Sequence, residues 1–324
     1  MREGVFSLIC AQGLTKQYGD KLALDNVTFE IGEGQVVGLL GLNGAGKSTT
    51  MNILTGCISA TAGKVTIGGY DIASNPRQAK RITGYLPEYP AFYPEMKVRD
   101  HLRFICGLKG IAAGRKEHIA ELCRLVGLEN MQGRMVRNLS KGYRQRLGFA
   151  QALVGSPKVI ILDEPTVGLD PHQIIEIRRL IKDSGQRGTV IVSSHILSEI
   201  QAVCDRVIML QKGRVIADCP TGEMAGRLAS GGRMRIRVQG DADDIKAALR
   251  RIPEMGRLQQ LAQNEPNTWD FALESIGGAD LRAAVFRALA AADLPLLATI
   301  GGDISLEEAF LSLAADAGGE GGVP

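Results

Sequence analysis

Short apolar runs alternate with helix-periodic segments over the first two-thirds of the chain. The runs VVGLL at 36–40, KVIIL at 158–162 and TVIVS at 189–193 are rich in Val and Ile, which is typical of buried strands. Two of these runs are followed by helical patterns after a short turn. This order predicts a mainly parallel sheet whose faces are covered by helices.

Two other patterns accompany this sheet. Residues 8–18 and 23–31 alternate apolar and polar positions more strictly and predict an antiparallel flank. Between Val98 and Val136 the pattern is helical throughout, so we expect a helical subdomain at about 98–150 beside the sheet. Residues 1–225 are therefore expected to form one large α/β domain.

A second, smaller domain is expected at 233–316, after a linker of small residues at 226–232. The strand pattern MRIRV is followed by a helical pattern, two strand patterns around the turn NEPN, a second helical pattern and the strand pattern LPLLATI. This β-α-β-β-α-β order predicts an α+β ferredoxin-like sandwich. The residues expected on the buried faces of its two helices are Ile245, Leu249, Ile252, Leu281, Val285 and Leu289.

The chain ends in two further patterns. ISLEEAFLSLAA predicts a final helix, in which Ser305 and Glu308 are spaced as a capping box. The glycine-rich tail at 317–324 is expected to be disordered.

Composition narrows the class of protein. Hydrophobic residues make up 45% of the chain and charged residues 23%, as in ordinary soluble domains. The net charge of +3 gives little reason to expect nucleic acid or an anionic membrane surface as a partner. The six cysteines have no metal-ligand spacing and are expected to be reduced thiols of a cytoplasmic protein. No apolar run reaches the ~18 residues of a membrane span, so any membrane role is expected to act through a partner.

A glycine-rich loop follows the first apolar run. GLNGAGKST fits the pattern G-x-x-x-x-G-K-[ST], with a predicted strand before it and a predicted helix after it. Its glycines let the backbone wrap closely around phosphates, and N–H groups at a helix N-terminus favour an anion. Lys47 is expected to reach the β- and γ-phosphates of a nucleoside triphosphate, and the Ser48 hydroxyl to ligate Mg²⁺. The residues expected around the nucleotide are Gly41, Asn43, Gly44, Gly46, Lys47, Ser48 and Thr49.

Carboxylates follow a second apolar run, in the sequence IILDEPTVGLD. Parallel strands deliver their carboxyl ends to one edge of a sheet, where ligands bind. Asp163 is therefore expected to hold Mg²⁺, and Glu164 to polarise an attacking water. The third run brings His195 to the same edge, where it could bond the γ-phosphate. A lone histidine is often structural, but three converging strands favour the functional interpretation.

Together these segments resemble the ATP-binding-cassette ATPases, a P-loop NTPase family. The glycine-rich loop, NLSKGYRQR at 138–146, LDEPTVGLD and SSH occur in the family's order and spacing, over about residues 6–220. The resemblance implies ATP and Mg²⁺ as cofactors. It also implies a head-to-tail homodimer, with ATP between the loop of one chain and the LSGGQ-type turn of the other. Ser140 and Gly142 match that turn, whereas Lys141 replaces its first glycine and Tyr143 its glutamine.

The serine turn has a second interpretation. A serine hydroxyl, a glycine N–H and a helix N-terminus can bind an anion that arrives from outside the chain. The same residues can simply cap a helix on a solvated basic face. The sequence alone leaves both interpretations open.

Three more positions follow the family pattern. Tyr18 matches the aromatic residue that stacks on adenine, with an ordinary core or surface tyrosine as the alternative. Asp170 matches the residue that links the two sites across the dimer. Glu88 stands where the family commonly has Gln, and its carboxylate can still take a place near Mg²⁺ or the attacking water.

The resemblance also implies a membrane partner. In the family, the surface formed here by GYLPEYPAFYPEMKVRDHL receives cytoplasmic helices of the membrane subunits. Tyr89, Phe92 and Tyr93 could form the docking cleft, or they could pack on their own domain. The chain is most similar to ATPase subunits of bacterial exporters, and is expected at the inner face of the cell membrane, bound to a multi-span permease. An import ATPase and a soluble cassette protein that acts on ribosomes or nucleic acid are the alternatives.

Overall fold

The computed structural model describes residues 7–223, 233–276 and 279–300. The chain divides into two compact units, Met1–Pro220 and Thr221–Pro324. The predicted linker at 226–232, the predicted helix with Ser305 and Glu308, and the tail at 317–324 lie outside the described residues.

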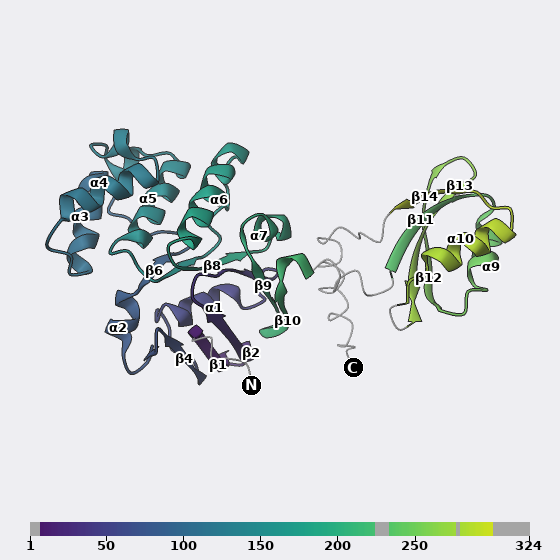
Figure 1. The fold of residues 1–324 in the computed structure, drawn as a ribbon, viewed down its shortest axis with the longest axis horizontal. Coiled ribbons are helices and arrows are strands. Elements are labelled where there is room, and N and C mark those ends of the chain that lie inside the picture. The colour runs from purple at the N-terminus through teal and green to yellow at the C-terminus, as the bar shows by residue number, and fades with distance from the viewer. Residues whose placement is uncertain (1–6, 224–232, 277–278, 301–324) are drawn as a thin grey trace. The chain divides into compact units, whose positions relative to one another are not determined.

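A sheet of strands with mostly parallel neighbours forms the centre of the first unit (Figure 1). In the described residues its strand order is β10-β9-β3-β8-β7-β6, and only the β9–β10 pair is antiparallel. The three predicted apolar runs are its central strands, and β3 and β8 are buried at every position because both faces of the sheet are covered. The strands are β3 Val36–Leu40, β6 Thr83–Leu86, β7 Val159–Leu162, β8 Thr189–Ser194, β9 Arg206–Gln211 and β10 Arg214–Pro220.

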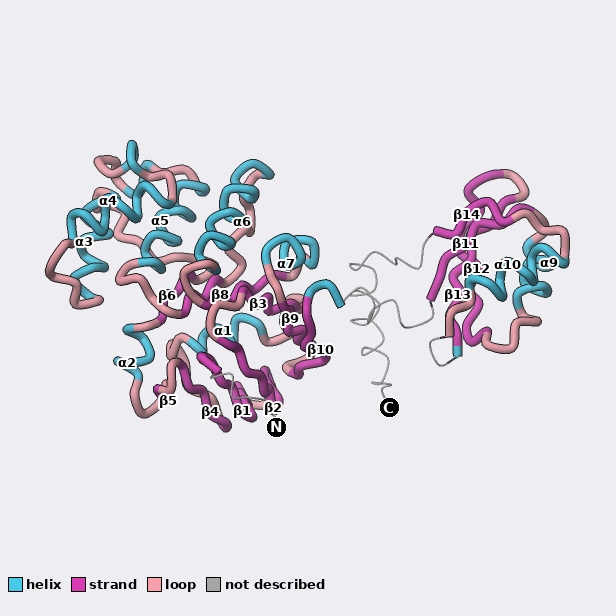
Figure 2. The backbone as a smooth tube through the Cα atoms, viewed as in Figure 1, coloured by secondary structure: helices cyan, strands magenta, loops and turns pink. Residues whose placement is uncertain are grey.

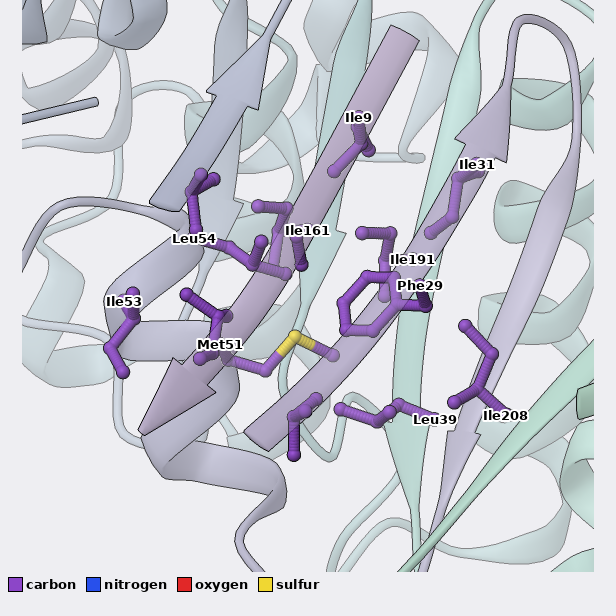
Figure 3. Packing of buried hydrophobic residues seen from close by; sticks show 14 of the residues in the cluster. Ile9, Phe29, Ile31, Leu39, Met51, Ile53, Leu54, Ile161, Ile191 and Ile208 are labelled. Atoms are coloured by element: carbon purple, nitrogen blue, oxygen red, sulfur yellow. The ribbon is translucent and has the colours of Figure 1, made fainter. Parts of the chain in front are cut away.

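The predicted antiparallel flank is a second sheet, of order β2-β1-β4-β5 within the described residues. Helix α1 (Lys47–Leu54) lies between the two sheets (Figure 2). Figure 3 shows the core that results, in which Phe29 of β2, Met51 of α1 and Leu39 of β3 pack together. The strands are β1 Ser7–Tyr18, β2 Lys21–Gly32, β4 Ala62–Ile67 and β5 Tyr70–Asp71.

A group of helices lies at the β6 edge of the parallel sheet (Figure 1). The sequence predicted helical structure throughout 98–136, but the helices are interrupted. Gly110 and Gly114 take left-handed backbone conformations between α3 and α4, which ends one helix and begins the next. The elements in this part of the chain are α2 Pro76–Arg81, α3 Val98–Leu108, α4 Arg115–Leu125, the 3₁₀ turns η1 Glu129–Met131 and η2 Val136–Asn138, and α5 Lys141–Leu153.

Two helices complete the first unit, and both begin close to the carboxyl end of a central strand. Helix α6 (Pro171–Gly185) follows β7, and α7 (Leu197–Val203) follows β8. The loops before these helices are where the predicted catalytic residues lie.

The second unit has the predicted β-α-β-β-α-β order. In its described residues the sheet order is β12-β13-β11-β14, every neighbouring pair is antiparallel, and α9 and α10 cover one face (Figure 2). The predicted helix faces are buried against Ile236 and Phe271. This confirms the ferredoxin-like prediction. The elements are β11 Arg233–Gln239, α9 Ala242–Leu249, β12 Met255–Glu265, β13 Thr268–Ser275, α10 Arg282–Ala291 and β14 Leu296–Ile300.

Candidate active site

A pocket of about 400 Å³ opens at the carboxyl end of β3, and most of the predicted nucleotide residues line it. Parallel strands β3, β7 and β8 end at this edge of the sheet, which brings segments far apart in the sequence together. The lining residues are Tyr18, Lys21, Ala23, Asn43, Gly44, Gly46, Lys47, Ser48, Thr49, Glu88, Glu164, Val167 and His195.

The glycine-rich loop is held tightly against its neighbours. Gly46, the residue before α1, has a φ of 107°, and a Cβ there would lie 2.6 Å from Leu24 Cδ2 and 2.9 Å from the Ala23 carbonyl oxygen. Gly41, the first residue of the loop, is buried, and a Cβ there would lie 2.6 Å from the Leu210 carbonyl oxygen. Any side chain at these two positions would push the loop out of place. No side chain caps α1, so its first N–H groups are free to face an anion.

Lys47 is buried and folds back over the loop. Its Nζ donates to the Gly41 carbonyl oxygen at 2.7 Å and lies 3.4 Å from Glu164 Oε1. Only 5% of the side chain is exposed. A buried ammonium needs such partners, because an unpaired charge in this environment is costly. Lys47 therefore joins the loop after β3 to the carboxylate after β7.

Glu164 lies between two groups that can carry positive charge. Its Oε2 is 2.9 Å from His195 Nδ1, while its Oε1 faces Lys47. The backbone of Glu164 is left-handed, with a φ of 48°, which is unusual for a residue with a side chain. Such strain costs about 1–3 kcal/mol and persists only where the surroundings enforce it. The strained backbone sets the carboxylate towards both Lys47 and His195.

Asp163 is not among the residues that line the pocket, and it is 3% exposed. The Ser193 hydroxyl donates to its Oδ1 at 2.5 Å. Burial raises the pKa of the Asp163 carboxyl above its usual value, and the charges of Glu164 and Glu88 add to the rise. Hydrogen bonds from Ser193 and from Ser48 lower this pKa. The contact with Ser48 brings the hydroxyl at the start of α1 and the carboxylate at the end of β7 together.

Two residues lie at the rim of the pocket. Tyr18 is 48% exposed, which excludes the core-tyrosine alternative, and Lys16 Nζ lies 5.0 Å from the centre of its ring. Glu88 follows β6 and is hydrogen-bonded to the neighbouring Tyr89, whose pKa this bond raises.

Ser140, Gly142 and Asp170 are not among the residues that line the pocket. The Ser140 hydroxyl caps α5, accepting from the backbone N–H of Tyr143 at 3.4 Å. Asp170 caps α6 in the same way, through Gln173 N–H at 2.9 Å. Within one chain Ser140 and Asp170 cap helices. The nucleotide contact expected of Ser140 and Gly142 is with a second copy of the chain and stays a prediction.

Contiguous sequence motifs did not predict the residues that hold the segments of the site through hydrogen bonds. Besides Ser193, the buried Glu199 of α7 accepts hydrogen bonds from Thr166 Oγ1 at 2.6 Å and Ser194 Oγ at 3.0 Å. The amide of Gln145 in α5 donates to the Pro165 carbonyl oxygen at 2.8 Å. Apart from the Ser194–Glu199 bond, these contacts join segments distant in sequence. The local signal for them is the serine pair that precedes His195.

The aromatic residues of the predicted docking loop divide into two groups. Phe92 packs edge-on against His101, with ring centres 5.4 Å apart, and Tyr93 packs edge-on against Phe104 at 5.3 Å. Tyr89 is 82% exposed. Phe92 therefore packs on its own domain, as the alternative interpretation expected, whereas Tyr89 does not.

A family model and the related proteins all point to the same family. The ABC transporter family model matches residues 24–167. The bacitracin transport ATP-binding protein of Bacillus licheniformis is 37% identical over 68% of this chain and 72% of its own length. The linearmycin resistance ATP-binding protein of Bacillus subtilis is 32% identical over 76% of this chain and 79% of its own length.

Solved structures that are similar to this chain are also ATP-binding cassettes. The ATP-binding subunit of an ABC transporter has a TM-score of 0.63 at 31% identity, covering 68% of this chain and 93% of its own. A dimeric ATP-binding cassette in a post-hydrolysis state, bound to ADP and Pi, has a TM-score of 0.60 at 25% identity, covering 66% of this chain and 98% of its own. Among the residues that the structure describes, no helix is both long and apolar enough to cross a membrane. The chain belongs to the ABC transporter family, as an ATP-binding cassette that binds and hydrolyses ATP.

Proposed function

We propose that the chain is the ATPase subunit of an exporter, and that ATP hydrolysis depends on Glu164 and its two neighbours. The observation that carries the catalytic part is the position of the Glu164 carboxylate, 3.4 Å from Lys47 Nζ and 2.9 Å from His195 Nδ1. Export is inferred from relatives named for bacitracin transport and linearmycin resistance.

In this proposal Glu164 accepts a proton from the attacking water, as a general base does. His195 orients the carboxylate and is placed to bond the γ-phosphate. Lys47 exchanges its bond to the Gly41 carbonyl oxygen for the β- and γ-phosphates, which are stronger acceptors for an ammonium. Tyr18 has one ring face next to Lys16, and we assign its other face to adenine. The backbone of Gly41–Thr49 receives the phosphates.

Mg²⁺ is proposed as the metal, held by Ser48 and Asp163, with Glu88 near it. Within the described residues no three His, Cys, Asp or Glu side chains are grouped as a metal site. This fits Mg²⁺, which is usually bound through one or two carboxylates together with substrate phosphates rather than by an all-protein cage. The hydroxyl–carboxylate pair of Ser48 and Asp163 offers hard oxygen ligands of this type. When bound, the ion neutralises charge that develops on the phosphates.

The functional unit is proposed to be a homodimer. Ser140, Gly142 and Asp170 do not line the pocket of their own chain, and Ser140 and Asp170 are exposed at the starts of α5 and α6. A second copy, arranged head to tail, would bring its Ser140 and Gly142 to the phosphates. The related cassette that is dimeric and bound to ADP and Pi supports dimerisation. Lys141 then adds a positive charge on the side that faces the partner's nucleotide.

Dimerisation is tested with a Glu164→Gln variant, which keeps the shape of the site and removes the base. We expect light scattering to show a dimer in saturating Mg·ATP and a monomer without nucleotide. A variant that stays monomeric in Mg·ATP, both alone and with its membrane partner, would overturn the dimer proposal. Lys47→Ala is the matched control, because it should stay monomeric under both conditions.

The partner is proposed to be a multi-span permease that docks beside the exposed Tyr89, and this places the chain at the inner face of the membrane. Tyr93 and Leu108 are also exposed on this subdomain, at 52% and 70%.

The second unit is proposed to brace or regulate the dimer. Deletion of 233–324 should then change dimerisation or the ATPase rate, and unchanged values of both, with unchanged transport, would count against this role.

The proposal is tested as a whole by purifying the tagged full-length chain from its host in mild detergent. We expect a multi-span membrane protein at two cassettes per complex, identified by mass spectrometry. Recovery of ribosomes or DNA in place of a membrane protein would instead support the soluble alternative. A membrane complex that takes up substrate into right-side-out vesicles, and never expels substrate from them, would favour import.

A further inference from the structure

Ser193 makes a contact that the proposed roles do not include. It is the second-last residue of β8 and is fully buried, with strand β3 on one side of β8 and β7 on the other. Its hydroxyl donates to Asp163 Oδ1 at 2.5 Å and accepts the backbone N–H of Glu164 at 2.8 Å. One hydroxyl thus contacts both adjacent acidic residues of the site.

We infer that Ser193 is a positioning residue for ATP hydrolysis, whose hydroxyl fixes the Asp163 carboxylate and the Glu164 backbone in the catalytic arrangement. This inference rests on the proposed roles of Asp163 and Glu164. A hydroxyl has one proton to donate and lone pairs that accept, so both capacities of Ser193 are used here. Alanine would fill nearly the same space and lose both bonds.

The bond to Glu164 matters because of that residue's backbone. Glu164 has a φ of 48°, a conformation that side-chain-bearing residues rarely adopt without support. Its N–H donates to Ser193 Oγ, and this anchor lies on the neighbouring strand. Without it, the peptide before Glu164 could relax to a commoner conformation. The carboxylate would then turn away from Lys47 and His195.

The bond to Asp163 restricts the carboxylate that is proposed to hold Mg²⁺. A carboxylate at the end of a strand can rotate about two side-chain bonds, and Ser193 holds one of its oxygens. The other oxygen is left for the metal. Hydrogen-bond partners of this type orient metal ligands, and their loss typically lowers metal affinity or activity about 10- to 100-fold.

The adjacent Ser194 has a different environment. Its hydroxyl donates to Glu199 Oε2 at 3.0 Å and accepts from the N–H of Ile196 at 3.0 Å. Successive side chains of a strand point to opposite faces, so the two serines cannot replace one another. Of these two serines, it is Ser193 that contacts the acidic pair.

The test compares Ser193→Ala with the wild-type chain, with Ser193→Thr as the variant that keeps a hydroxyl. Ser184→Ala is the matched control, because it removes another buried hydroxyl, which bonds the Leu180 carbonyl oxygen within α6. Four quantities are measured: kcat, KM for ATP, ATP affinity with and without Mg²⁺, and hydrogen exchange of the Glu164 amide.

For Ser193→Ala we expect kcat to fall about 10- to 100-fold, with Mg²⁺-free ATP affinity within about twofold of wild type. The gain in ATP affinity on adding Mg²⁺ should shrink, and the Glu164 amide should exchange faster. Ser193→Thr should restore most of kcat, and Ser184→Ala should change none of these quantities.

An unchanged kcat and unchanged amide exchange in Ser193→Ala would overturn the inference, as would equal losses in Ser184→Ala. If Ser193→Ala does not fold, Ser193→Cys repeats the test, since a thiol fills similar space and is only a weak donor. Failure of the proposed catalytic roles is seen separately, because Glu164→Gln would then hydrolyse ATP at the wild-type rate.

Discussion

Two helices of this protein have a lysine at the first helical position with a glycine next to it, and the surroundings of the two lysines differ. Helix α1 starts after Gly46 with no side-chain cap, and its Lys47 is buried beside Glu164. Helix α5 starts after Ser140, which caps its own helix, and its Lys141 is exposed. A helix start alone does not make a site. The carboxylates and the histidine that follow the neighbouring strands make one at α1, whereas α5 starts beside Gly168 and Gln173.

This comparison predicts that removing the base has the largest effect. In Glu164→Gln the carboxylate that accepts the proton is lost, so we expect kcat to fall about 10²- to 10⁴-fold. ATP binding should persist, because Lys47 and the loop are intact. Phosphate release and nucleotide binding measure the two quantities separately. Glu117→Gln, on the exposed surface of α4, serves as the control and should hydrolyse ATP normally. A kcat within threefold of wild type would remove Glu164 from the role of base.

The second prediction compares the two lysines. Lys47→Ala loses charged hydrogen bonds worth about 1.5–3 kcal/mol each, so the affinity of a single chain for ATP should fall at least tenfold. Lys141→Ala should leave this affinity unchanged, because Lys141 does not line the pocket. Titration of each variant with a fluorescent ATP analogue, at concentrations where the chain is monomeric, measures both. Equal losses in the two variants would contradict the distinction between the helix starts.

The same contrast explains how far the sequence could be interpreted. Residues 41–49 form the loop locally, so contiguous sequence sufficed to predict it. Strands β3, β7 and β8 were predicted because both of their faces are buried, which makes them continuous apolar runs. Strand β6 is short and contains Gly84, whose missing Cβ would lie 2.0 Å from the Ala152 carbonyl oxygen of α5. That close approach is a tertiary fact with no periodic signal.

The supporting residues of the site were missed for a related reason. Ser193 and Glu199 act across strands and helices, and neither residue type suggests such a role by itself. In the sequence, LSEIQAV is an ordinary amphipathic helix with an acidic first turn. Its glutamate is buried because Thr166 and Ser194 donate to it. The chemistry-bearing residues could therefore be predicted from contiguous motifs, whereas the residues that orient them could not.

The third prediction concerns Ser140. In the monomer, Ser140→Ala should cost only about 0.5 kcal/mol, since the cap bond is long at 3.4 Å. Monomer affinity for ATP should not change. In the proposed dimer the hydroxyl faces a phosphate, so ATP-driven dimerisation should weaken about tenfold or more. Analytical ultracentrifugation with Glu164→Gln as the background gives the dimerisation constant. Ser184→Ala, which removes a serine hydrogen bond within α6 of the first unit, controls for the loss of such a bond as such. Equal dimerisation of Ser140→Ala and its background would leave Ser140 as a helix cap only.

The smallest expected effect is on stability at the start of α5. A cation in the first turn of a helix opposes the helix dipole, which typically costs about 0.3–1 kcal/mol. Lys141→Gln should therefore stabilise α5 slightly, and slow the hydrogen exchange of its backbone amides. The only tryptophan, Trp269, lies in β13 of the second unit, so tryptophan fluorescence reports that unit and should not respond. At Lys47 the same substitution should not stabilise α1, because it removes the counter-charge of the buried Glu164. Slower exchange in both helices would mean that the two lysines oppose their helix dipoles alike, and that the contrast lies only in the carboxylates around them.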